Sequence, residues 1–199
     1  MKKMNSRNRT FRLALLAMLI AVLIVLGYVN IPMPAGLSIT FNMIPVAIAA
    51  IALGLPGGAI VGGAFGLISF LQCFNLFGSS AMGAALVGIS PFLMFLQRFV
   101  SRLLVGVLTA IIYRSLDHVN TPVRCGITGF SAAFLNTLFF MSLLVLLFGH
   151  TEYMQNAMAG RSIIAYIVAS VGINAVVEML VAAMVTSAVG TALVKSKLV

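Results

Sequence analysis

The chain has 199 residues, of which 62% are hydrophobic and only 8% charged, and its mean hydropathy is +1.17. Soluble domains carry about 25% charged residues, so this composition excludes a soluble globular protein and indicates an integral membrane protein. In such a protein the formal net charge of +9 indicates how the chain is oriented in the membrane, not that it binds nucleic acid.

The N-terminal segment has the charge pattern of a signal peptide but is predicted to be the first membrane span. An apolar run over residues 13–26 follows five basic residues, and no small-residue cleavage site comes after it. These basic residues are Lys2, Lys3, Arg7, Arg9 and Arg12. Within the span, Ala17 and Ala21 are four residues apart and Ala14 lies on nearly the same face, which is typical of close helix contacts. The spacing does not decide whether that face meets this chain's own bundle or another protein.

The rest of the chain divides into further apolar segments of the length that crosses a membrane. A span needs about 20 apolar helical residues. We therefore predict an all-α fold, a six-transmembrane-helix bundle forming one membrane domain over residues 1–199. The spans are placed near 12–29, 43–55, 57–76, 91–113, 123–148 and 161–193. Pro56 followed by Gly57 and Gly58 predicts a tight turn over 54–58, between the second and third spans.

Four glycines stand four residues apart, from the end of the second span into the third: Gly54, Gly58, Gly62 and Gly66. In lipid there is no hydrophobic drive between helices, so helices associate by close packing, which glycine permits. The row therefore predicts a structural contact between helices, without chemistry of its own.

The basic residues predict the orientation. With six spans, nine of the twelve fall on one side, so both termini and the 114–122 loop are predicted to be cytoplasmic. The nine are Lys2, Lys3, Arg7, Arg9, Arg12, Arg114, Arg124, Lys195 and Lys197. The opposite side has the longer connections 30–42, 77–90 and 149–160, which suggest a cover over a solute that enters from outside.

Polar side chains within spans are costly and usually face a cavity or a partner. Arg98 and Arg102 are one turn apart on the fourth span. The others are Gln72, Asn136, Asn174 and Glu178. One hypothesis is a pocket for a small polar solute, in which a guanidinium holds a carboxylate. The alternatives are that Arg102 and Glu178 pair within the bundle, that Arg98 faces lipid headgroups or a loop, and that Glu178 is a structural or coupling element.

No catalytic or metal-binding arrangement is predicted. His118 and His150 fall in loops on opposite sides, and two histidines with three acidic residues cannot assemble a metal site within the membrane. Cys73 and Cys125 are interpreted as small apolar fillers. The chain lacks the phosphate-binding loop of ATPases, so energy for uphill transport must come from a partner or an ion gradient.

Several stretches together carry a resemblance to a known family. They are AMLIA (17–21), FNMIPVAIAAIALGLPGGAIVGGAFGLISFL (41–71), ISPFLMFLQRFVSRLLVG (89–106), FLNTLFFMSLLVLLFG (134–149) and INAVVEML (173–180). The chain resembles the substrate-binding S components of energy-coupling-factor (ECF) vitamin transporters over nearly its whole length. The resemblance implies a multi-pass protein of a prokaryotic plasma membrane that binds a vitamin from outside, without a cofactor. It also implies docking, through Ala17 and Ala21, on a membrane coupling subunit attached to two ATP-binding-cassette ATPases.

Among these transporters, the stretches SPF…RFVSRLLVG and NTLFF look most like the pantothenate type. Pantothenate has one carboxylate, an amide and two hydroxyls, which would suit Arg102 with Asn136, Asn174 and Gln72 as amide partners. The absence of tryptophan argues against a large stacked ring such as flavin. An S component for pyridoxine or a pyrimidine-type precursor is the alternative, although a neutral ring would not need the arginine. An autonomous secondary transporter is a more distant one.

Overall fold

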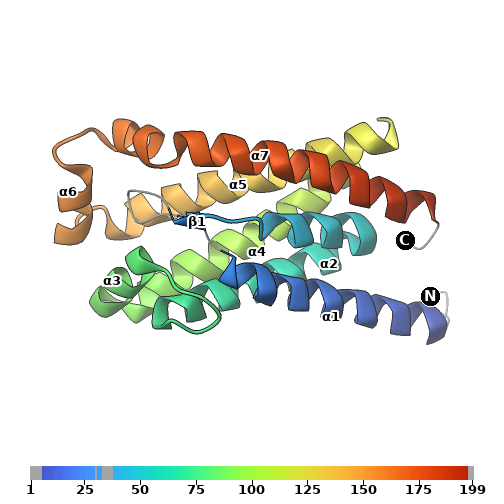
Figure 1. Cartoon of the computed structure of the whole chain (residues 1–199), viewed down its shortest axis with the longest axis horizontal. Helices are drawn as coiled ribbons and strands as arrows, with labels where there is room; N and C mark the ends of the chain where they lie inside the picture. Colours follow the sequence, from blue (N-terminus) through green and yellow to red (C-terminus); the bar gives the residue numbers. More distant parts are fainter. Residues whose placement is uncertain (1–5, 30, 33–37, 197–199) are drawn as a thin grey trace.

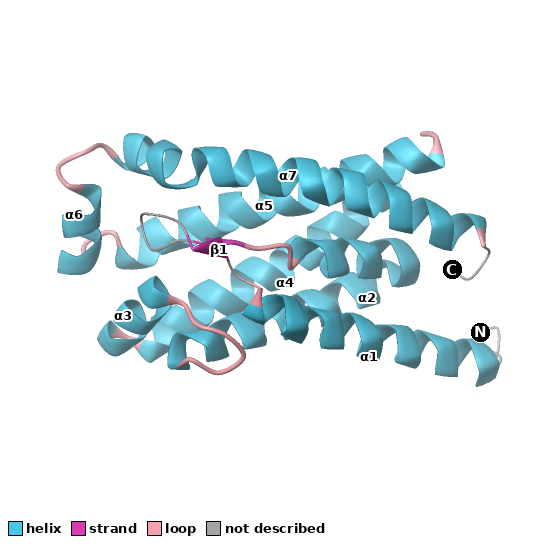
Figure 2. Cartoon of the chain, viewed as in Figure 1, coloured by secondary structure: helices cyan, strands magenta, loops and turns pink. Residues whose placement is uncertain are grey.

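The computed structural model describes residues 6–29, 31–32 and 38–196 (Figures 1 and 2). The long helices are α1 (Ser6–Tyr28), α2 (Met43–Leu71), α4 (Pro91–Ser115), α5 (Thr121–Phe148) and α7 (Ile163–Lys195). The shorter elements are strands β1 (Ile31–Pro32) and β2 (Ser38–Ile39), which pair antiparallel, the 3-10 turn η1 (Gln72–Phe74), and helices α3 (Ala81–Ile89) and α6 (Glu152–Met158). The basic residues Lys2, Lys3 and Lys197 lie outside the described residues.

The prediction of an all-α fold is confirmed, apart from the two strands of two residues each. In the described part of the chain, five helices are long and apolar enough to cross a membrane: α1, α2, α4, α5 and α7. Their apolar surfaces face outward as well as inward, as in a helix surrounded by lipid. The molecule is a multi-pass membrane protein.

Helix α2 folds back on itself at Gly54, which has φ 66° and ψ −152°. Glycine tolerates this left-handed region because it has no Cβ. A straight helix of 29 residues would be about 44 Å long. Yet Asn42 at one end and Ser69 near the other line the same cavity, so the two arms run antiparallel. Figure 1 shows the ribbon doubling back near the end of the bundle where α1 begins.

The row of glycines in α2 packs directly on the backbone of α4, an interface that we call the glycine seam (Gly58, Gly62 and Gly66). A Cβ on Gly62 would lie 2.7 Å from the carbonyl oxygen of Arg102, and one on Gly66 would lie 2.9 Å from the Cα of Phe99. A Cβ on Gly58 would collide with the carbonyl of Gly106. The predicted close approach is confirmed at these three positions.

Gly54 was predicted as the first glycine of the packing row, and this is wrong. Among the described residues nothing lies within 4 Å of a Cβ placed on Gly54. Its role is the backbone turn, after which Pro56 falls in the first turn of the second arm, where a missing N–H is tolerated. The four-residue spacing could not separate a turn glycine from a contact glycine.

The two ends of the bundle differ in their connections. Helix α1 begins and α7 ends at one end, whereas β1, α3 and α6 lie at the other (Figure 1). Two segments predicted only as connections therefore contain helices. Each has a capping side chain at its start: Ser80 Oγ accepts from the Gly83 N–H at 3.2 Å, and Thr151 Oγ1 from the Met154 N–H at 3.4 Å.

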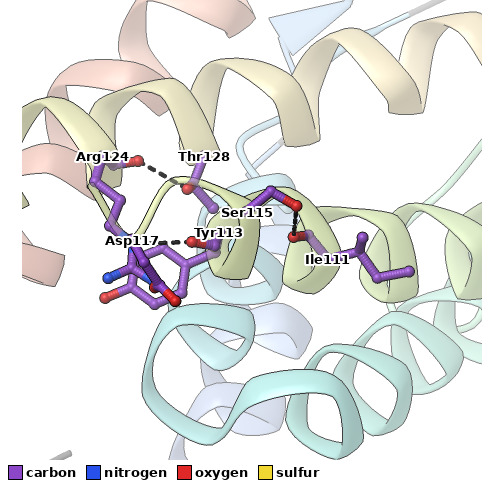
Figure 3. Close-up of polar contacts among 6 residues, drawn as sticks. All are labelled: Ile111, Tyr113, Ser115, Asp117, Arg124 and Thr128. Carbon is purple, nitrogen blue, oxygen red and sulfur yellow. Dashed lines mark hydrogen bonds and ion pairs between the residues drawn. The ribbon is translucent and has the colours of Figure 1, made fainter. Parts of the chain in front are cut away.

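The connection between α4 and α5 lies at the end of the bundle where α1 begins and is held by Arg124 (Figure 3). Its Nε donates to the Tyr113 carbonyl at 2.8 Å, and its guanidinium stacks 3.8 Å from the centroid of the Tyr113 ring. It also forms an ion pair with Asp117. The backbone carbonyl of Arg124 accepts from Thr128 Oγ1 at 2.8 Å. One arginine therefore joins the end of α4 to the first turns of α5.

Candidate solute-binding site

A cavity of about 110 Å³ lies between α2, α3, α4, α5 and α7. A water molecule needs about 10–15 Å³ by this measure, so the cavity has room for a small solute. All six polar residues predicted from the sequence line it: Gln72, Arg98, Arg102, Asn136, Asn174 and Glu178. Its apolar lining comes from Phe65, Met82, Phe140 and Met141. Residues as far apart in sequence as Thr40 and Glu178, a separation of 138 positions, therefore share one site.

The Arg102 guanidinium is buried and has few partners. Its Nη1 donates to Ser101 Oγ at 2.9 Å, whereas its Nε has no hydrogen-bond partner among the described residues. The guanidinium carbon lies 4.6 Å from the centroid of the Phe140 ring and 5.2 Å from that of Phe65. In the described structure Arg102 forms no ion pair with Glu178, so the predicted alternative of mutual neutralisation is not observed. The Phe65 and Phe140 rings stabilise the Arg102 guanidinium by cation–π contact, and its positive charge remains available to a solute in the cavity.

Arg98 is more fully engaged than Arg102. Its Nη1 donates to Ser69 Oγ at 3.2 Å and its Nη2 to Ser80 Oγ at 3.1 Å, so it connects α4 to α2 and to the cap of α3. The side chain is only 6% exposed, so the alternative that it faces lipid headgroups is wrong. Arg98 does contact the connection before α3, at Ser80, but it also lines the cavity, so its contact with a solute stays a prediction. Arg98 holds the cavity wall in place.

Gln72 likewise connects the chain around the cavity. Its Nε2 donates to the carbonyls of Gly27 at 3.3 Å and Phe77 at 3.2 Å. These bonds join the end of α1 to the segment after η1. The two amide hydrogens are thus already used, which leaves the amide oxygen for a solute.

The amides and the carboxylate on the other side of the cavity come from α5 and α7. Asn136 is 8% exposed, and its Oδ1 is without a hydrogen-bond partner in the described part of the chain. Asn174 lies one turn before Glu178 on α7 and is also buried. Glu178 Oε1 accepts from the Thr40 backbone N–H at 2.7 Å, which ties α7 to the segment after β2.

Several lining residues were missed from the sequence. Thr40 and Asn42 had been placed in an outer connection, and Ser69, Ser80 and Thr137 are ordinary hydroxyl residues in helical or loop positions. Nothing in their spacing predicts that they point inward. Phe65 and Phe140 were missed because an aromatic residue in an apolar span gives no signal of its own.

The small residues of α1 face away from the bundle. Ala14, Ala17 and Ala21 are exposed, whereas Leu15 and Leu19 on the opposite face pack into the core. Helix α1 lies at one edge of the bundle (Figure 1). The question left open by the spacing is thus answered for the part of the chain that the structure describes: its helices do not cover the alanine face.

Comparison with known proteins gives a consistent result. The family model described as "ECF transporter, substrate-specific component" matches residues 11–190. The chain is 27% identical over 198 residues to the "Pantothenate transporter PanT" of Leuconostoc mesenteroides, covering 95% of each chain. It is also 27% identical over 203 residues to the "Pantothenic acid transporter PanT" of Lactococcus lactis, covering 96% of this chain and 97% of that one.

Proposed function

The chain belongs to the family of substrate-specific components of ECF transporters, and on this premise we propose that it binds pantothenate in the cavity around Arg102. The pantothenate transporters of Leuconostoc and Lactococcus are relatives along nearly the whole chain, which supports this choice of solute. The vitamin would reach the cavity from the side of the membrane where α3 and α6 lie.

One observation carries the proposal: Arg102 is a buried cation without a carboxylate partner in the described structure. A buried unpaired charge is costly, by several kcal/mol, and the cost is offset when an opposite charge with good hydrogen-bond geometry is supplied. The cavity wall holds Arg98, Arg102 and Glu178, whose formal charges sum to one positive charge when all three are ionised. A monoanionic solute neutralises it, and a carboxylate fits the two-pronged guanidinium.

A neutral ring solute such as pyridoxine is the alternative, and the aromatic residues of the cavity argue against it. The faces of Phe65 and Phe140 already carry Arg102, and Arg98 also lies over Phe140 at 5.0 Å. A stacked ring would compete with a guanidinium for the faces that Arg98 and Arg102 occupy. A neutral solute would also leave the charge of Arg102 unpaired.

We propose further that the chain crosses the membrane six times with both termini cytoplasmic. The reversal at Gly54 supports this count, since it lets α2 contribute two passes and the other four long helices one each. Helix α1 begins and α7 ends at the same end of the bundle (Figure 1). The 115–120 connection with Arg124 is also at that end, as expected for the cytoplasmic side.

The partners in this proposal are a membrane coupling subunit and two ATP-binding-cassette ATPases. The exposed face of Ala14, Ala17 and Ala21 supports docking of another helix, because small residues permit close approach in lipid. Ala17→Leu should then abolish pantothenate uptake by cells that express the whole transporter, while purified protein still binds the vitamin. Ala188→Leu, at an exposed alanine of α7, is the matched control and should leave uptake unchanged.

The proposed function is tested by calorimetric titration of the purified chain in detergent. Pantothenate, pantothenyl alcohol, pyridoxine and riboflavin would be titrated separately, without any ATPase. We expect saturable binding of pantothenate, with at least tenfold weaker binding of the alcohol, which lacks the carboxylate. Tight binding of pyridoxine or riboflavin instead would reject pantothenate as the solute. Equal binding of the acid and the alcohol would reject the role of the arginine.

A further inference from the structure

Asn42, just before α2, lines the cavity and has a buried side-chain oxygen that accepts no hydrogen bond from the described residues. The residue is only 1% exposed. Buried polar atoms in folded proteins are nearly always paired. An unpaired acceptor on a residue of the cavity wall is therefore a candidate to accept a hydrogen bond from a bound solute.

A local structural role does not account for Asn42. It stands at the N-cap position of α2, where asparagine often accepts from the first free N–H groups of the helix. Here its backbone is already helical, at φ −63° and ψ −16°, and the side chain makes no capping hydrogen bond. The amide is thus free to serve the cavity instead of the helix end.

The neighbours of Asn42 give this part of the cavity a consistent chemistry. Two residues earlier, the Thr40 N–H donates to Glu178 Oε1, which fixes the 40–42 segment against α7 and leaves the second carboxylate oxygen without a hydrogen-bond donor among the described residues. Asn136 adds a further unpartnered oxygen within the described structure. The residues that hold these acceptor oxygens line the same cavity as Arg102, whose Nε is a donor without a partner in the described structure. Such a cavity is complementary to a solute that has a carboxylate and also hydrogen-bond donors.

We propose that Asn42 is a specificity-determining residue whose Oδ1 accepts a hydrogen bond from a hydroxyl of the bound solute, in a part of the cavity shared with Glu178. This inference rests on the proposed function. It assigns the hydroxyl end of the solute to Asn42, whereas Arg102 binds the carboxylate. A solute that has the carboxylate but lacks the hydroxyl leaves Asn42 Oδ1 unpaired, so the protein binds that solute more weakly. Sites built to pair with a hydroxyl reject analogues that lack it more strongly than apolar pockets reject an extra group.

The test compares pantothenate with its two monodeoxy analogues, each lacking one hydroxyl, by calorimetry on the purified full chain. For the unaltered protein we expect one analogue to bind about 10- to 100-fold more weakly than pantothenate. In Asn42→Leu, which keeps the number and branching of the side-chain heavy atoms but removes the acceptor oxygen, that analogue and pantothenate should bind with equal affinity. Thr109→Val is the control, because its hydroxyl is equally buried and unpartnered in the described chain but lies outside the cavity. It should keep the full preference.

A second measurement distinguishes this role from a structural one. Because Asn42 Oδ1 is unpaired in the empty protein, an apolar replacement should leave the thermal unfolding midpoint of the empty protein unchanged or raise it. The added stabilisation by pantothenate should shrink. If empty Asn42→Leu has a lower midpoint, the larger leucine is overpacked and Asn42→Ala is titrated in its place: equal affinities for pantothenate and the deoxy analogue support the inference, and a retained preference for the hydroxyl overturns it.

The outcomes separate this inference from the proposed function. If the unaltered chain does not bind pantothenate, the proposed function fails and the role of Asn42 with it. If it binds pantothenate and both deoxy analogues equally, or if Asn42→Leu keeps the preference of the unaltered chain, only the role of Asn42 is overturned.

Discussion

Two adjacent glycines of α2 should respond in opposite ways to the same substitution. Gly62 belongs to the glycine seam, and its added Cβ would lie 2.7 Å from the Arg102 carbonyl oxygen. Gly63 faces side chains, and its nearest neighbour would be a ring carbon of Phe99 at 3.7 Å, an ordinary contact. We predict that Gly62→Ala destabilises the protein and that Gly63→Ala does not.

The size of the destabilisation depends on whether the atoms in contact with the added Cβ can move away. At Gly62 the contact is about 0.7 Å shorter than the 3.4 Å at which ordinary packing begins, and both groups are tied to helix backbone. A rotamer change cannot relieve it, so α2 and α4 must separate, at an overpacking cost of about 1–3 kcal/mol. The gain in helix propensity from glycine to alanine is common to both variants and cancels in their comparison. Gly62→Ala should therefore be about 1–3 kcal/mol less stable than Gly63→Ala.

The buried cysteines supply the assay. Cys73 is 2% exposed and Cys125 is fully buried, so a thiol-reactive fluorophore labels them only when the protein opens. Heating the detergent-solubilised variants with this probe gives their unfolding midpoints. A midpoint of Gly62→Ala equal to or above that of Gly63→Ala would refute the close backbone contact of the glycine seam.

Three other predictions concern charged and capping groups. Arg102→Ala should weaken pantothenate binding at least about 30-fold, since removing one partner of a buried charge pair costs about 2–5 kcal/mol. Calorimetry on this variant should find equal affinities for pantothenate and pantothenyl alcohol. A retained preference for pantothenate would contradict the role of Arg102. Ser80→Ala should cost about 1 kcal/mol through the lost α3 cap, with a smaller loss of affinity than Arg102→Ala, measured by thermal unfolding and titration. Asp117→Asn should leave the unfolding midpoint nearly unchanged, because Asp117 is 72% exposed and such pairs contribute about 0–1 kcal/mol. Arg124→Ala should lower it, since a backbone hydrogen bond and a stacking contact are also lost.

The main features of the fold could be predicted because the membrane simplifies the problem. Only helices satisfy the backbone of a few long apolar segments in lipid, so composition and segment length lead to an all-α bundle. The reversal near 54–58 was also visible, since proline and glycine interrupt an apolar run. The short helices α3 and α6 were not, because a seven- to nine-residue helix stabilised by a capping hydroxyl has too little periodicity to stand out from a loop.

Some residues of the candidate site could likewise be predicted from the sequence, and others could not. Arg98, Arg102 and Glu178 could be chosen because a charge within an apolar span is rare and needs a reason. Asn42 could not, because polar residues are ordinary at the end of a span, and only the three-dimensional structure reveals that its oxygen is buried and unpaired. Nor could the sequence separate the roles of the two arginines. That difference depends on Ser69 and Ser80, which reach Arg98 from other elements.

The glycine seam and the arginines turn out to be one feature, although the sequence suggested that the glycines have no part in the chemistry. Gly62 lies against the carbonyl of Arg102, and Gly66 lies 3.3 Å, measured from its added Cβ, from that of Arg98. Because the α4 backbone itself faces α2 at these residues, their side chains must project to the flanks of the interface. There Arg98 reaches Ser80, and Arg102 reaches the face of Phe140. Separating the helices at Gly62 would therefore displace both guanidinium groups, so Gly62→Ala should weaken pantothenate binding as well as stability, whereas Gly63→Ala should weaken neither.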